Sequence, residues 1–230
     1  TALAKSCCAS QGLRCVILSG SRHNSESQRM LSCLLQALQE RPSLKELSLH
    51  ELKLGSASKA IEALLINTQS LQKLHLAYSW RWNQEELTRI QRGLKKNTTL
   101  QAITLSSTLP PILQSLRNHP RLKTLHVRVG DLTGLDALLL CEKSKITELS
   151  IERHYSTSRD QPLGMTSVLE ALGRKTTLTM LTIAGCRLRI DQTRKLNTVL
   201  HKHQELQSLD LTSRYFTSIE LAELGPALYE

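Results

Sequence analysis

The chain has 230 residues, of which 40% are hydrophobic and only 3% aromatic, so its core must be mainly aliphatic. Its formal net charge of +10 at pH 7 makes an acidic partner worth considering. No apolar stretch reaches the roughly 18 residues of a membrane span, and the first residues lack a signal-peptide pattern. Because the first residue is Thr1, we expect a fragment of a longer protein.

One aliphatic pattern, L-x-x-L-x-L, recurs through the chain. Its eight matches start at Leu13, Leu44, Leu71, Leu100, Leu122, Ile146, Leu178 and Leu206. Repetition at intervals of 22 to 32 residues is typical of a solenoid, in which each unit covers its neighbour's apolar side. No Pro/Gly/Ser-rich linker interrupts the pattern. We therefore predict a single domain over residues 1–230 with about eight repeats.

Each repeat reads as a short strand followed by a helix. In the unit from Leu178 to Glu205, Leu178, Leu181 and Ile183 alternate with polar residues, and helical spacing begins near Ile190. Strands lie about 4.8 Å apart while helix axes need about 8–10 Å, so the stack must curve around its strands. The sequence predicts an α/β, right-handed leucine-rich-repeat solenoid: a horseshoe with a concave parallel sheet and convex helices.

Several helix starts can also be predicted. Asn83 and Glu86 have the spacing of a capping box, Asp191 is a candidate N-cap, and Pro110-Pro111 suit a first helical turn. The units between residues 100 and 145 are only 22 and 24 residues long. We expect shortened helices and uneven curvature there.

The segments KKNTTLQAITL (residues 95–105) and GRKTTLTMLTIAGCRL (residues 173–188) resemble leucine-rich repeats of the ribonuclease-inhibitor-like class. Similar units occur in NOD-like receptors, in tropomodulin-type proteins and in leucine-rich bacterial effectors. This resemblance implies a non-catalytic protein-recognition or scaffold module. It leaves open a ligand-sensing or autoinhibitory region of an innate immune receptor, or a host-directed effector. Most units lack the Asn or Cys that the family places at the turn, although Cys186 occupies that position.

Outward-facing strand residues should form a polar concave face of mixed charge. Residues 123–128 make a basic row and residues 147–152 an acidic one. After the third strand, residues 78–82 hold both tryptophans, and Trp, Tyr and Arg dominate interface hot spots. The candidate partner-binding residues are Lys73, His75, Tyr78, Trp80, Arg81, Trp82, Lys123, His126, Arg128, Glu148 and Glu152. For the tryptophans, covering the edge of a layer is an equal alternative.

No catalytic, cofactor or metal site is expected. The chain has no phosphate-binding glycine loop, no H-E-x-x-H and no G-x-S-x-G. His50 and His75 should lie close together on the concave face, but a third metal ligand is lacking. Six scattered cysteines form neither a C-x-x-C pair nor a zinc spacing, so we expect free, mostly buried thiols in a reducing, cytoplasmic compartment.

The positive charge has two interpretations. Many cations follow the predicted helices, where they would offset the negative end of the helix dipole; these are Lys95, Lys96, Arg117, Lys143, Lys145, Arg174, Lys175 and Lys202. The alternative is a basic surface that binds nucleic acid or an acidic membrane. The scarcity of aromatic side chains argues against single-stranded nucleic acid.

Overall fold

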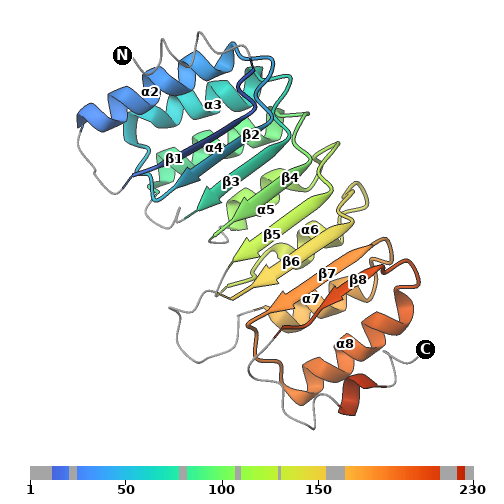
Figure 1. The fold of residues 1–230 in the computed structure, drawn as a ribbon. Helices are drawn as coiled ribbons and strands as arrows, with labels where there is room; N and C mark the ends of the chain where they lie inside the picture. The colour runs from blue at the N-terminus through green and yellow to red at the C-terminus, as the bar shows by residue number, and fades with distance from the viewer. Residues whose placement is uncertain are drawn as a thin grey trace.

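Eight strands alternate with helices and form one sheet (Figure 1). The computed structural model describes residues 12–20, 25–77, 82–106, 110–128, 131–153, 164–212 and 222–225. The strands are β1 (Cys15–Ser19), β2 (Glu46–His50), β3 (Lys73–Ala77), β4 (Ala102–Leu105), β5 (Thr124–Arg128), β6 (Glu148–Glu152), β7 (Met180–Ala184) and β8 (Ser208–Asp210). They pair in chain order and all pairs are parallel, which confirms the predicted sheet.

The aliphatic repeats stack in register on the convex face of the sheet, which faces the helices. Each strand begins two residues after the first aliphatic residue of its repeat. One row runs through Val16, Leu47, Leu74, Ile103, Leu125, Leu149, Leu181 and Leu209, and a second through Leu18, Leu49, Leu76, Leu105, Val127, Ile151 and Ile183. All are buried except Leu18 and Leu209 in the first and last strands, which are partly buried. The core is therefore a continuous aliphatic ladder.

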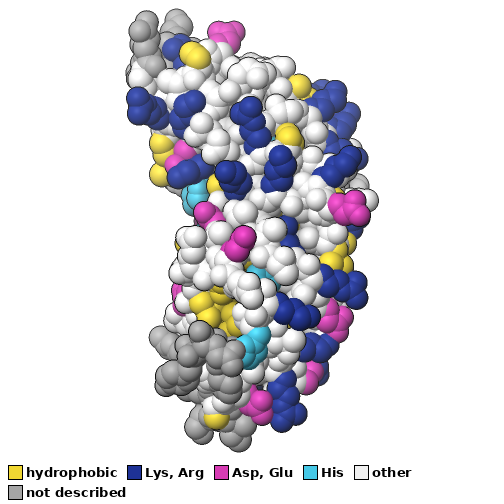
Figure 2. Space-filling model, turned by 90° about the vertical axis from the view of Figure 1, so that its right-hand side faces the viewer, with side chains coloured by type: hydrophobic (Ala, Val, Ile, Leu, Met, Phe, Trp, Pro, Cys, Tyr) yellow, Lys and Arg dark blue, Asp and Glu magenta, His cyan; other side chains and the backbone are white. Residues whose placement is uncertain are grey.

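Helices cover the convex face of the sheet (Figure 1). They are α2 (Ser25–Gln39), the 3-10 turn η1 (Gly55–Ala57), α3 (Ser58–Asn67), α4 (Gln84–Lys96), α5 (Pro110–Leu116), α6 (Leu135–Leu139), α7 (Met165–Leu172) and α8 (Ile190–Lys202). At 7 and 5 residues, α5 and α6 are the shortest α-helices of this series, as the compressed repeats predicted. Figure 2 views the stack from one edge and shows its outline hollowed on the sheet side.

The structure confirms two of the predicted helix starts and contradicts one. The Asn83 side chain accepts the Glu86 N–H at 2.9 Å, and Glu86 accepts the Asn83 N–H at 2.7 Å, which confirms the capping box. Pro110 opens α5 as expected. The Asp191 prediction is wrong, because α8 already begins at Ile190 and the Asp191 carboxylate pairs with Arg189 at 3.0 Å.

Buried polar side chains organise the connections that lead from helix to strand. Asn97 donates to the Leu65 carbonyl of the preceding repeat at 2.7 Å and accepts the N–H groups of Thr99 and Leu100. Thr68 accepts the equivalent N–H groups one repeat earlier. In the last connection, the Nε2–H of His203 donates to the Leu172 carbonyl at 2.9 Å. Different side chains thus fix the same turn.

Four cysteines lie within the described residues, and all four are free thiols. Cys186 is buried, and burial raises the pKa of its thiol to about 11. Cys15 and Cys33 are exposed, so the expectation of mostly buried thiols is wrong for these two. Among the described helices, none is long and apolar enough to cross a membrane.

Candidate functional site

The concave face of the sheet, on the side away from the helices, forms the floor of a hollow. It has a volume of about 900 Å³ and extends over β2 to β6, with Arg153 beyond the end of β6. Of the predicted binding residues, Lys73, His75, His126, Arg128, Glu148 and Glu152 line it. Lys123 is exposed one residue before β5 and does not line the hollow. The register of the sheet therefore brings together six of the candidates, which lie on β3, β5 and β6.

Three histidines share the floor. His75 lies opposite Thr104, which in turn lies opposite His126, and His50 ends the neighbouring strand. The His75 Nε2 atom is 3.5 Å from the Glu46 carboxylate. Burial lowers the pKa of His75 despite this carboxylate, and the charges of His50, His126 and Lys73 lower it further. His75 is thus mainly neutral at pH 7.

The sequence predicted proximity only for His50 and His75, yet the structure places His126 within electrostatic range as well. The reason is the in-register pairing: His75 and His126 lie on the same face two strand spacings apart, with only the short Thr104 side chain between them. Within the described ranges, no group of three His, Cys, Asp or Glu residues has a geometry that could hold a metal ion.

The predicted basic and acidic rows partly neutralise each other. The Arg128 Nε atom donates to Glu152 at 2.8 Å, and the Thr124 hydroxyl donates to Glu148 at 2.8 Å. Both contacts join β5 to β6. The middle of the hollow therefore presents paired charges and hydrogen-bonding groups, and it is not a strongly charged patch of one sign.

Two outward-facing serines are more covered than the sequence pattern indicated. Ser48 and Ser150 are each only 4% exposed, because longer side chains flank them in register. The Ser150 hydroxyl is buried without a hydrogen-bond partner among the described residues. The floor thus contains an unsatisfied hydroxyl beside His126, a feature that strand alternation alone does not reveal.

The aromatic cluster is only partly visible. Tyr78, Trp80 and Arg81 lie outside the described residues. Trp82 is half-buried against the core, and its indole N–H donates to the Leu52 carbonyl at 3.5 Å. For Trp82 this contact favours the alternative in which the ring covers the edge of a layer.

No family model matches the chain, and neither does any curated protein. Similar solved structures include a protein from Bacteroides fragilis, 12% identical over 91% of this chain and 71% of that one, with a TM-score of 0.53. The C-terminal domain of Caenorhabditis elegans tropomodulin is 14% identical over 88% and 93%, with a TM-score of 0.30. Actin-binding site 2 of leiomodin-1 is 12% identical over 88% and 87%, with a TM-score of 0.33.

At this identity the Bacteroides fragilis structure shows a shared fold and nothing about a partner. The two lower TM-scores add no argument. The architecture of this chain, parallel strands stacked in order with helices on one face, is that of a leucine-rich-repeat-like solenoid.

Proposed function

We propose that this chain is a non-catalytic recognition module that binds a protein segment in the concave hollow. The observation that supports this proposal is the hollow itself, a continuous floor of about 900 Å³ built from five successive strands. Four strand spacings of about 4.8 Å give a floor roughly 19 Å wide. Such a width suits a stretch of polypeptide of several residues.

The chemistry of the floor favours a polar polypeptide over a small apolar ligand. Small-molecule sites are mostly apolar with a few polar groups. Here twelve of the fourteen lining residues carry charged or hydrogen-bonding side chains, including Glu46, Lys73, His75, Arg128 and Glu152. A peptide backbone offers donors and acceptors that match such a surface, and its side chains can complement charges of both signs.

The test uses two charge reversals on opposite flanks of the hollow. The double variant Lys73→Glu with Arg128→Glu changes two exposed side chains. A partner purified by affinity capture with the native chain is then titrated against each form. We expect the double variant to weaken the affinity by about 30-fold or more, since each reversed interfacial charge costs on the order of 1–2 kcal/mol.

The matched control is Lys53→Glu with Arg187→Glu, which makes the same change in net charge at exposed positions outside the hollow. The control should bind as tightly as the native chain. A partner that tolerates the hollow variant but is lost with the control would refute the proposed site.

A place in an innate immune receptor or in a bacterial effector remains a hypothesis that rests on the repeat resemblance of residues 95–105 and 173–188. No contact within the described residues favours either one. The recognition surface would serve the same role in any such parent protein.

A further inference from the structure

One edge of the solenoid carries most of the net positive charge. All seven helix-to-strand connections meet there, because the strands are parallel (Figure 1). We define the basic edge as the last two residues of each preceding helix and the connection to the next strand: residues 38–45, 66–72, 95–101, 115–123, 138–147, 171–179 and 201–207. These ranges contain twelve Lys and Arg residues and three Glu residues. The basic edge thus accounts for nine of the ten net positive charges.

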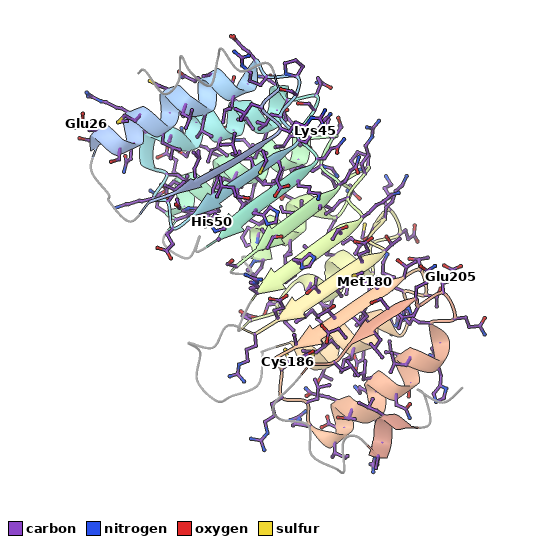
Figure 3. All side chains as sticks on the ribbon, in the orientation of Figure 1. Glu26, Lys45, His50, Met180, Cys186 and Glu205 are labelled. Carbon is purple, nitrogen blue, oxygen red and sulfur yellow. The ribbon has the colours of Figure 1, made fainter. Side chains whose placement is uncertain are left out.

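Figure 2 looks onto the basic edge and shows Lys and Arg side chains along its length. Figure 3 marks Lys45 and Glu205 near its two ends, and His50 and Cys186 at the opposite edge of the sheet. Nine of the twelve cations are exposed: Lys45, Lys95, Lys96, Arg121, Lys123, Lys143, Lys145, Arg174 and Lys202. The charge is therefore available to a partner outside the chain.

Helix dipoles explain only a small part of this charge. The effect falls off within the last helical turn, and of the twelve cations only Lys95, Lys96 and Lys202 lie in one. The last turns of α2, α3, α5, α6 and α7 contain no basic residue. Lys143 and Lys145 follow α6 by four and six residues. The expectation that these cations offset helix dipoles therefore fits Lys95, Lys96 and Lys202 and is wrong for Lys143 and Lys145.

Neighbouring carboxylates do not neutralise the basic edge either. Lys96, Arg121, Lys143 and Lys145 form no ion pair with any other described residue. In contrast, cations elsewhere do find partners: Arg92 contacts Glu62, Arg128 contacts Glu152, and Arg194 contacts Glu223. A concentrated, uncompensated charge of one sign indicates an external polyanion.

We propose that the basic edge binds the surface of an anionic phospholipid membrane. Seven strand spacings of about 4.8 Å make the strip roughly 34 Å long on its sheet side, and it extends across both the strand and the helix layer. A bilayer surface contacts such a broad strip as a whole. Eight of the twelve cations are Lys, whose flexible point charges suit a diffuse layer of phosphate and carboxylate headgroups.

An exposed leucine separates this partner from nucleic acid. Leu140 directly follows α6 in the middle of the basic edge and is 44% exposed. The connections on either side are tied to its own: Cys141 lies 3.5 Å from the Asn118 side chain, and Lys175 donates to the Ser144 carbonyl at 3.1 Å. An exposed apolar side chain within a basic strip gains free energy at a lipid headgroup boundary and gains none against nucleic acid phosphates.

The experiment measures sedimentation of the whole chain with vesicles of phosphatidylcholine alone or mixed equally with phosphatidylserine. We expect binding only to the mixed vesicles, and weaker binding as salt screens the charges. The triple variant Lys96→Glu, Arg121→Glu, Lys145→Glu should bind about 100-fold more weakly or worse, since each cation contributes about 1 kcal/mol. A neutral triple variant with Gln at these positions should show an intermediate loss, and it guards against a folding defect.

The control variant Lys53→Glu, Lys59→Glu, Arg187→Glu has the same net charge as the reversed triple variant and changes three exposed residues outside the basic edge. It should retain nearly native vesicle binding. Leu140→Ser should weaken vesicle binding by roughly tenfold and leave binding to duplex DNA unchanged. The hollow variant Lys73→Glu with Arg128→Glu should still bind vesicles, so this proposal and the proposed function can fail separately.

Three results would overturn the proposal. The native chain could fail to sediment with acidic vesicles at low salt. The control variant could lose as much affinity for acidic vesicles as the edge variant, which would show that total net charge and not the basic edge determines binding. Duplex DNA could bind the native chain while acidic vesicles do not, which would assign the basic edge to nucleic acid.

Discussion

The aliphatic rows and the helix-to-strand connections solve the same stacking problem in different ways. The rows use one kind of side chain throughout, and Leu47, Leu74 and Leu149 are nearly interchangeable in position and burial. The connections use Thr68, Asn97 and His203 at comparable turns. Apolar packing needs side chains of matching volume and shape. A buried N–H or carbonyl needs only a hydrogen-bond partner, and several types of side chain can provide one.

This difference determines how each region should respond to change. A row loses packing energy in proportion to the atoms removed, at any pH. A connection loses specific hydrogen bonds, and where it uses a histidine it becomes sensitive to pH. Substitutions in the two regions should therefore behave differently.

The largest effect is expected in an aliphatic row. Leu149→Ala removes a side chain that is 1% exposed between Leu125 and Leu181, and it should lower the free energy of unfolding by about 2–5 kcal/mol. Ser150→Ala, the adjacent residue on the outer face, removes a buried hydroxyl that has no partner among the described residues. That change should be neutral or slightly stabilising. Urea denaturation of both variants measures the contrast, and equal losses would contradict the assigned strand faces.

The next effect depends on pH and concerns His119, which is 4% exposed in the connection before β5. Burial lowers the pKa of His119 to about 4, below its ordinary value of 6.5. Below pH 6.5 the unfolded chain therefore binds a proton that the folded chain excludes. Stability is unaffected above pH 7 and should fall by roughly 3 kcal/mol between pH 6.5 and about pH 4.

The variant His119→Asn tests this loss, because Asn97 shows that an amide can serve in such a connection. The slope of unfolding free energy against pH over this window should become clearly shallower in the variant. An unchanged slope would show that acid destabilisation arises at other groups.

A smaller loss, measured at pH 7, is expected at Asn97. Asn97→Ala leaves the Leu65 carbonyl and the N–H groups of Thr99 and Leu100 without their buried partner, at a cost of about 2–3 kcal/mol. Thr98→Ala changes an exposed neighbour in the same connection and should cost less than about 0.5 kcal/mol. Thermal unfolding of the two variants at pH 7 provides the comparison; similar melting temperatures would remove Asn97 from the structural account.

The smallest effect on stability should come from the concave face. Arg128 and Glu152 form an ion pair at 2.8 Å, but the Arg128 side chain is 55% exposed. Arg128→Gln should therefore change the free energy of unfolding by less than about 1 kcal/mol. A much larger loss in chemical denaturation would mean that this pair supports the fold, and binding data from variants at this position would then need reinterpretation.

The fold could be predicted from the sequence because its signal is repeated eight times. A single strand such as Ser208–Asp210 has little identity of its own, but its spacing from seven similar segments identifies it. The buried connections could not be predicted in the same way. Thr68, Asn97, His119 and His203 share a structural role but belong to three residue types, so no single pattern links them.

The site was predicted in part for a related reason. Strand alternation correctly placed Lys73, His75 and Arg128 on one face, because the period of a strand is fixed. It could not show that His126 lies near His75, nor that Ser150 is covered, since both depend on the length of side chains on neighbouring strands. The sequence predicted many cations near the ends of the helices. Only the observed helix boundaries show that several of them lie beyond the last helical turn.

Interstrand cross-linking tests the parallel stack most directly. Thr104 and His126 are partners in register on β4 and β5, so a cysteine at each position should form a disulfide under mild oxidation. The background is a chain whose cysteines, apart from the buried Cys186, are replaced by Ser. Cysteines at Thr104 and Ser150, two strands apart, should not cross-link within one chain. Efficient cross-linking of the second pair and none of the first would contradict the stacked order on which the hollow and the basic edge both depend.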